Sequence, residues 1–253
     1  MTPNDAIDPQ RQDERLVRFR DQIRRWRSGE LSDGQFRSLR LDYGIAIRRQ
    51  TPMLCIAMPE GRLNSTQLRA LARLARQYGH GFCRVTARQE MQLSCLTIED
   101  APDILAELAA LGMPGFQTSG KGARHIAQVG EARIAAHAAV PADQAAVVED
   151  ASFARHREQN AAFARWLTRC AHSQRVAGYR AVSLPLKRRG ALPGKLSADQ
   201  MDIVADLATH FSFGELRIGL EQNIILADVR EAHLYALWLT ARGAGLATPS
   251  RGA

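Results

Sequence analysis

Apolar residues near the N-terminus recur at spacings of three and four among charged neighbours. The stripe consists of Leu16, Phe19, Ile23 and Trp26. This periodicity predicts an amphipathic helix. Ser28 and Gly29 are expected to end it, and a second short helix is expected at 31–41. We expect the stripe to dock on the main body of the protein, with contact to a partner as the alternative.

The most informative pattern is an internal repeat. Residues 61–93 align without a gap with residues 194–226, at an offset of 133 residues counted from Gly61 to Gly194. Ten of the 33 aligned positions are identical, and others are conservative. Self-similarity at a fixed offset is the mark of a duplicated structural unit.

Both copies show the same order of expected elements. An apolar run at 52–59 or 180–186 is expected to form a strand, and a capped helix follows. Asn64 or Ser65 can cap the first helix, and Ser197 the second, with Gln200 at the spacing of a capping box. A hairpin and a closing helix complete each copy.

The order β-α-β-β-α, twice, predicts an α+β fold of duplicated ferredoxin-like half domains in a pseudo-two-fold arrangement. Helices would pack on one face of antiparallel sheets. The expected organisation is an N-terminal helical extension at 1–50, a first half domain at 51–125, an Ala-rich linker and helix at 126–175, with the helix at 153–170, and a second half domain at 176–253.

Composition adds a preference for anions. The net charge is +8, and nearly all of the basic residues are Arg, whose planar fork suits carboxylates and phosphates. A solvated Arg-rich surface is the alternative. Nucleic acid is not the expected partner, because aromatic residues make up only 6% of the chain and the hairpins offer only Phe82 for stacking on bases.

Several classes of site and location are not expected. No apolar run reaches the ~20 residues of a membrane span, and the polar N-terminus does not resemble a secretory signal, so we expect a cytoplasmic protein. The cysteines and histidines do not have metal-ligand spacing, so we predict no metal site and no 4Fe-4S cluster held by this chain. The cysteines are Cys55, Cys83, Cys95 and Cys170.

Two clusters remain as candidate anion sites. Arg84, Thr86 and Arg88 would share one face of a strand and could hold carboxylates, or could serve solubility alone. The segment 119–125, with two glycines, Lys121 and Arg124, could be an anion-binding turn or a solvated loop.

The runs PMLCIAMPEGRL, VTARQEMQL and FQTSGKGARH resemble the first half of the assimilatory sulfite and nitrite reductase hemoproteins, and 178–249 is similar to their second ferredoxin-like half domain. The resemblance implies siroheme, a tetrapyrrole with eight carboxylates, coupled to a 4Fe-4S cluster. It places Arg84 and Arg88 on the carboxylates and Gln92 at the cofactor pocket. Arg124 matches an Arg that binds the sulfite or nitrite anion, and Lys121 is a further candidate cofactor-binding residue.

Departures from the family pattern limit what the chain is expected to do alone. Cys55 stands where the family has an anion-binding Arg, and Gly120 where it has Asn. A short linker replaces the intervening domain, and the cluster-ligand region is not in the sequence. We therefore expect a shortened relative that binds siroheme or a reductase subunit without catalysing alone. The alternatives are a redox subunit completed by a separate cluster-carrying chain, and a tetrapyrrole or corrinoid biosynthesis protein related to precorrin-3B synthase.

Overall fold

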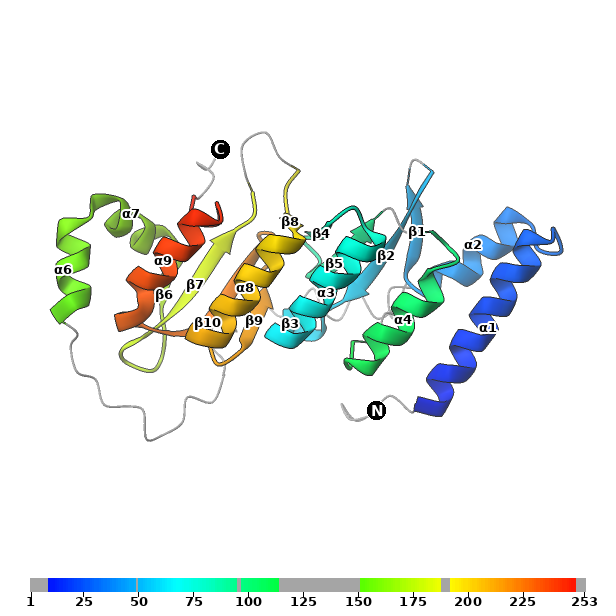
Figure 1. Cartoon of the computed structure of the whole chain (residues 1–253), viewed down its shortest axis with the longest axis horizontal. Helices are drawn as coiled ribbons and strands as arrows, with labels where there is room; N and C mark the ends of the chain where they lie inside the picture. The colour runs from blue at the N-terminus through cyan, green and yellow to red at the C-terminus, as the bar shows by residue number, and fades with distance from the viewer. Residues whose placement is uncertain (1–8, 49, 95–96, 114–150, 188–191, 249–253) are drawn as a thin grey trace.

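The computed structural model describes residues 9–48, 50–94, 97–113, 151–187 and 192–248 (Figure 1). The helices are α1 (Pro9–Arg27), α2 (Asp33–Leu41), α3 (Ser65–Tyr78), α4 (Ala101–Ala110), α6 (Ala151–Gln159), α7 (Ala161–Cys170), α8 (Ala198–Phe211) and α9 (Leu234–Gly243), with short 3-10 helices η1 (Pro59–Gly61) and η4 (Glu231–His233). The strands are β1 (Ile45–Arg48), β2 (Thr51–Ala57), β3 (Arg62–Asn64), β4 (Phe82–Val85), β5 (Glu90–Ser94), β6 (Ala171–Ser173), β7 (Tyr179–Pro185), β8 (Lys195–Ser197), β9 (Glu215–Ile218) and β10 (Asn223–Arg230).

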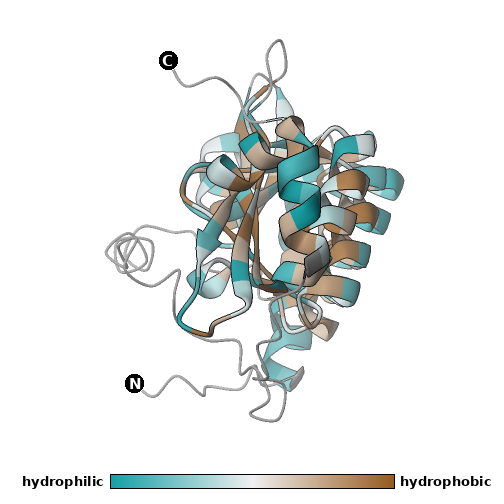
Figure 2. Cartoon of the chain, turned by 90° about the vertical axis from the view of Figure 1, so that its left-hand side faces the viewer, coloured by the Kyte–Doolittle hydropathy of each residue, from teal (hydrophilic) through white to brown (hydrophobic). Residues whose placement is uncertain are grey.

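The strands form two antiparallel sheets with matching orders. The first runs β1-β2-β5-β4-β8, and the second, taken in the same direction, runs β6-β7-β10-β9-β3. Helices α3, α4, α8 and α9 form a layer along the sheets in Figure 1, and Figure 2 shows helices gathered to one side of the strands. The prediction of a duplicated α+β arrangement is confirmed.

Each half also contributes one short strand to the sheet of the other half, which the sequence analysis did not predict. Strand β3 follows β2 in the chain but pairs with β9, and β8 pairs with β4. The exchange continues into the helix starts, where Ser65 N donates to Gly214 O and Ala198 N to Gly81 O, both at 2.8 Å. The two halves are therefore joined by main-chain hydrogen bonds.

Alternation along the strands separates a buried sheet face from an open one. On β2, Leu54 and Ile56 are fully buried, whereas Met53, Cys55 and Ala57 between and beside them are partly exposed. The same alternation holds on β4 and β5. Burial of the apolar face against the helices is the main favourable term for this layer.

The predicted helix caps form in both copies. Asn64 caps α3 and Ser197 caps α8, each in a capping box with the glutamine three residues on. These glutamines also reach the end of the closing helix, where Gln67 Nε2 donates to Leu111 O and Gln200 Nε2 to Ala244 O, both at 3.0 Å. In each half, one glutamine side chain therefore bonds both to the start of the first helix and to the end of the closing helix.

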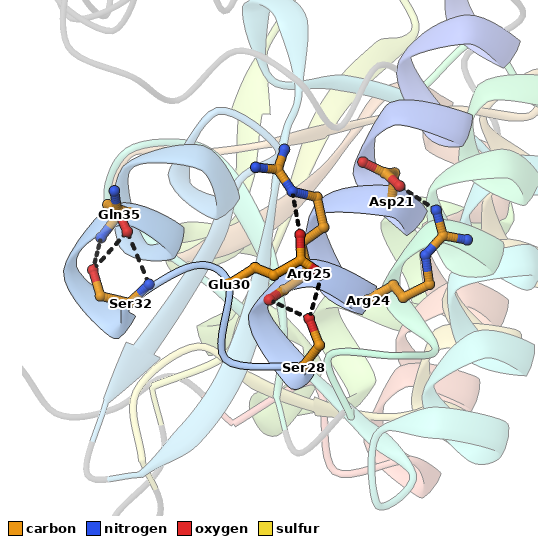
Figure 3. Close-up of polar contacts among 7 residues, drawn as sticks. All are labelled: Asp21, Arg24, Arg25, Ser28, Glu30, Ser32 and Gln35. Carbon is orange, nitrogen blue, oxygen red and sulfur yellow. Dashed lines mark hydrogen bonds and ion pairs between the residues drawn. The ribbon is translucent and has the colours of Figure 1, made fainter.

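The N-terminal helices dock on the first half, as predicted. Leu16, Phe19 and Ile23 are buried, and Arg20 forms an ion pair with Asp103 of α4 at 2.6 Å. Figure 3 shows the turn between α1 and α2, where Ser28 and Arg25 bond to Glu30. The capping box of Ser32 and Gln35 then starts α2 (Figure 3).

Two predicted regions differ in detail. The segment 1–50 ends in strand β1, which pairs with β2 and places Arg48 on the first sheet. The helix expected at 153–170 is two helices, because the side chain of Asn160 accepts from Ala162 N and Phe163 N and so starts α7. The Ala-rich part of the linker, 126–150, lies outside the described residues.

Candidate functional site

The open face of the first sheet carries a row of four residues that lie directly opposite one another on neighbouring strands. Cys55 of β2 pairs with Gln92 of β5, Gln92 with Arg84 of β4, and Arg84 with Lys195 of the exchanged strand β8. Such cross-strand pairs point their side chains to the same face. We call these four residues the first-sheet row.

The row is held by contacts along its length. Gln92 Nε2 donates to Cys55 Sγ at 3.6 Å, and Arg84 Nε donates to the carbonyl of Pro193 at 3.1 Å. Lys195 Nζ lies 4.0 Å from the centroid of the Phe82 ring. The bond from Nε fixes the guanidinium of Arg84 and leaves its terminal nitrogens for an anion.

Arg88 belongs to the turn beyond the row. Strand β4 ends at Val85, so the strand alternation expected for Arg84, Thr86 and Arg88 does not extend to Arg88. Its main-chain N–H donates to Thr86 Oγ1 at 3.2 Å, and its side chain is exposed. Arg88 therefore lies in the hairpin turn at the end of the first-sheet face.

The electrostatics of Cys55 show which charges act on this face. Burial raises the pKa of the Cys55 thiol, and the carboxylate of Glu90 raises it further. The hydrogen bond from Gln92 and the positive charges of Arg48 and Arg88 oppose that shift without overcoming it. Cys55 is thus a neutral thiol at neutral pH, set among cations.

Sequence reasoning missed two cations of this face. Arg48 arrives through the unpredicted strand β1, and Lys195 through the exchanged strand β8. The repeat contained a signal for Lys195, because it aligns with Arg62, another cation. Lys121 and Arg124 lie outside the described residues, so their roles stay predictions.

The second sheet repeats the row with different chemistry. Its four residues are Ser183, Ile225, Arg217 and Arg62, paired in the same order. Burial and the charge of Arg62 lower the pKa of Arg217. Both rows contain two cations. Ile225 stands where the first-sheet row has Gln92, so the second row lacks the amide that Gln92 provides.

The cations of the first-sheet row suit an anionic ligand. Within the described ranges, no three His, Cys, Asp or Glu side chains are grouped as metal ligands. Two cavities of about 190 and 490 Å³ include none of the four residues of the first-sheet row, although Ala57 of β2 lines the larger one. Among the described helices, none is long and apolar enough to cross a bilayer.

Comparisons with known proteins agree with the duplication. Residues 47–111 and 172–242, more than half of the chain, match the nitrite/sulfite reductase ferredoxin-like half domain. The ferredoxin–nitrite reductase of Synechococcus elongatus is 38% identical over 114 residues, which is 42% of this chain and 22% of that protein. The chloroplastic enzyme of Arabidopsis thaliana is 37% identical over 67 residues, 26% of this chain and 11% of that protein.

The fold comparison covers more of the chain. The structure of the Mycobacterium tuberculosis NirA protein superposes with a TM-score of 0.59 over 87% of this chain and 65% of that chain, at 12% identity, which shows a shared fold. The chain spans less than a quarter of the length of the two curated reductases. With its two half domains matched, the chain belongs to the nitrite/sulfite reductase ferredoxin-like half-domain family.

Proposed function

We propose that the chain binds an anionic tetrapyrrole of the siroheme class on the open face of its first sheet, and that it does not catalyse alone. The observation that carries this proposal is the first-sheet row, in which Arg84 and Lys195 stand side by side with Gln92. Arg48 and Arg88 add positive charge to the same face. A reductase subunit is the protein partner this function would require.

The residues present fit the chemistry of the group. A macrocycle with eight carboxylates needs several cations, and guanidinium groups bind carboxylates by two parallel hydrogen bonds. Met53, Ala57 and Phe82 are partly exposed and offer apolar surface for a flat ring. Siroheme, when bound, supplies the redox-active iron; Arg84 and Lys195 would hold the ring by its carboxylates.

Cys55 would contribute an uncharged side chain to the binding face. An Arg at this position would add a further positive charge, whereas the Cys55 thiol, whose pKa is raised, adds none at neutral pH. Arg124 remains the proposed contact for a sulfite or nitrite anion and Lys121 a proposed contact for the cofactor. We place this function in the cytoplasm, without a 4Fe-4S cluster from this chain.

A titration with siroheme tests the proposal. Binding should shift the Soret band saturably, and Arg84→Gln should raise the Kd about tenfold or more, because a charge-assisted bond contributes roughly 1.5–3 kcal/mol. Arg73→Gln is the matched control, since Arg73 lies on α3 and pairs with Glu107 at 2.5 Å in the helix layer. No spectral shift, or equal Kd values for the two variants, would contradict the proposal.

The alternatives are distinguished in the same system. Tighter binding of the metal-free macrocycle sirohydrochlorin than of siroheme would favour tetrapyrrole or corrinoid biosynthesis. Sulfite or nitrite reduction with reduced methyl viologen, appearing only when a cluster-carrying chain is added, would favour the redox subunit. Both relatives are named as ferredoxin–nitrite reductases, which favours the redox-subunit alternative.

A further inference from the structure

We propose a separate site for a small organic carboxylate between α7 and α9. A cavity of about 190 Å³ opens there, lined mainly by Arg165, Trp166, Arg169, Trp238 and Arg242. None of its lining residues belongs to the first-sheet row. The site is therefore independent of the tetrapyrrole proposal.

The cavity has a wall of tryptophan side chains and a rim of arginine side chains. Trp166 and Trp238 are 2% and 3% exposed, whereas the three arginines are exposed. Arg165 and Arg169 are one helical turn apart on α7, and Arg242 is one turn after Trp238 on α9, with its guanidinium carbon 5.2 Å from that ring. The guanidinium groups thus surround a pocket with aromatic sides.

In the first half, arginines of a flanking helix are paired with acids on and just before the closing helix. There Arg20 and Arg27 of the flanking helix α1 pair with Asp103 of α4 and with Glu99 just before it. Helices α4 and α9 begin and end at the repeat offset, which allows residue-by-residue comparison.

The acids of the first half have no counterparts in the second. Glu99, Asp103 and Glu107 align with Ala232, Ala236 and Thr240. No carboxylate lines the cavity, and no ion pair to Arg165, Arg169 or Arg242 is present among the described residues. Three like charges around one cavity repel one another, so an anion bound there would be favoured.

The size and the walls of the cavity define the ligand class. The pocket is open to solvent, and its volume of about 190 Å³ has room for a small ring or short aliphatic body bearing one carboxylate. Trp166 lines the cavity, and its buried Nε1 has no acceptor in the described part of the chain. The chemistry is that of a small aromatic carboxylate, with benzoate as the simplest probe.

Tryptophan fluorescence can report binding directly. The chain has three tryptophans, so in a Trp26→Phe background only the two cavity residues report. We expect saturable quenching by benzoate, and at least about tenfold weaker binding of the neutral isostere benzamide. Acetate, which carries the charge without the ring, should also bind more weakly.

Charge-neutralising variants identify the site. Arg169→Gln and Arg242→Gln should each raise the Kd for benzoate by about tenfold or more, whereas Arg20→Gln, which removes an acid-paired arginine of the first half, should leave it unchanged. The proposal is overturned if benzoate gives no saturable signal, if benzamide binds equally well, or if Arg20→Gln weakens binding as much as Arg169→Gln does. Siroheme binding at the first sheet is not involved in any of these readouts.

Discussion

Gln89 and Gln222 occupy equivalent positions of the repeat, and each donates its side-chain amide to a main-chain carbonyl of the other half. Gln89 Nε2 lies 2.7 Å from Ile218 O, and Gln222 Nε2 lies 3.1 Å from Val85 O. Both residues adopt left-handed backbone conformations, with φ of 58° and 60°. The two bonds therefore tie the hairpin of each half to the sheet of the other.

Shortening these side chains should loosen the junction between the halves. Asn tolerates a left-handed backbone but cannot reach as far as Gln. We expect Gln89→Asn and Gln222→Asn each to lower the free energy of unfolding by about 1 kcal/mol, as for a lost hydrogen bond. Urea unfolding measures this, with Gln159→Asn at the exposed C-terminal end of α6 as control. Equal midpoints for all three variants would exclude a role for these bonds in stability.

Two glycines make the close approach of the halves possible. A Cβ at Gly194 would lie 2.0 Å from Val85 O, and one at Gly61 would lie 2.6 Å from Ile218 O. Their φ values of 78° and 68° are also in the left-handed region. The obstructing atoms are main-chain oxygens of the sheet, so the clash is not relieved by moving a side chain.

We expect Gly194→Ala to destabilise the protein by more than about 2 kcal/mol, because the clash adds to the cost of the positive φ. Gly34→Ala is the matched control, since Gly34 lies in α2 with open space around its Cα. That substitution should be neutral or stabilise by up to about 1 kcal/mol. Thermal unfolding of the two variants provides the comparison, and a Gly194→Ala variant as stable as the wild type would show that the strand exchange tolerates displacement.

The sequence predicted what depends on local pattern. Apolar spacing and caps placed α3 and α8, and the repeat placed their hairpins. The exchange of β3 and β8 could not be predicted, because each is a three-residue strand whose partner lies more than 100 residues away in the chain. Lys195 joins the candidate site only through that exchange. Gly61 and Gln89 are nevertheless identical to their counterparts in the second copy, which indicates that both copies need these residues at the junction of the halves.

The capping boxes allow a test of whether the two halves depend equally on their first helices. In both, the cap side chain accepts from the backbone of the third helical residue. Asn64→Ala and Ser197→Ala should each cost about 1 kcal/mol, because both leave an N–H of the first turn without its acceptor. Circular dichroism during urea unfolding measures the loss. Thr66→Ala, one residue before Gln67 in the first turn of α3, is the control and should shift the midpoint little.

Buried thiols give stability a defined dependence on pH. Burial raises the pKa of Cys83 from 9.0 to about 12, so the folded protein keeps this proton over a range in which the unfolded chain releases it. Stability from this group is complete below pH 9 and is lost as the pH rises toward 12, at about 1.4 kcal/mol per pH unit. Cys83→Ala should unfold more easily at pH 7 because of the cavity it creates, yet lose less stability between pH 9 and 11 than the wild type. Urea midpoints across that range measure the difference in slope, and parallel slopes would show that Cys83 does not titrate on unfolding.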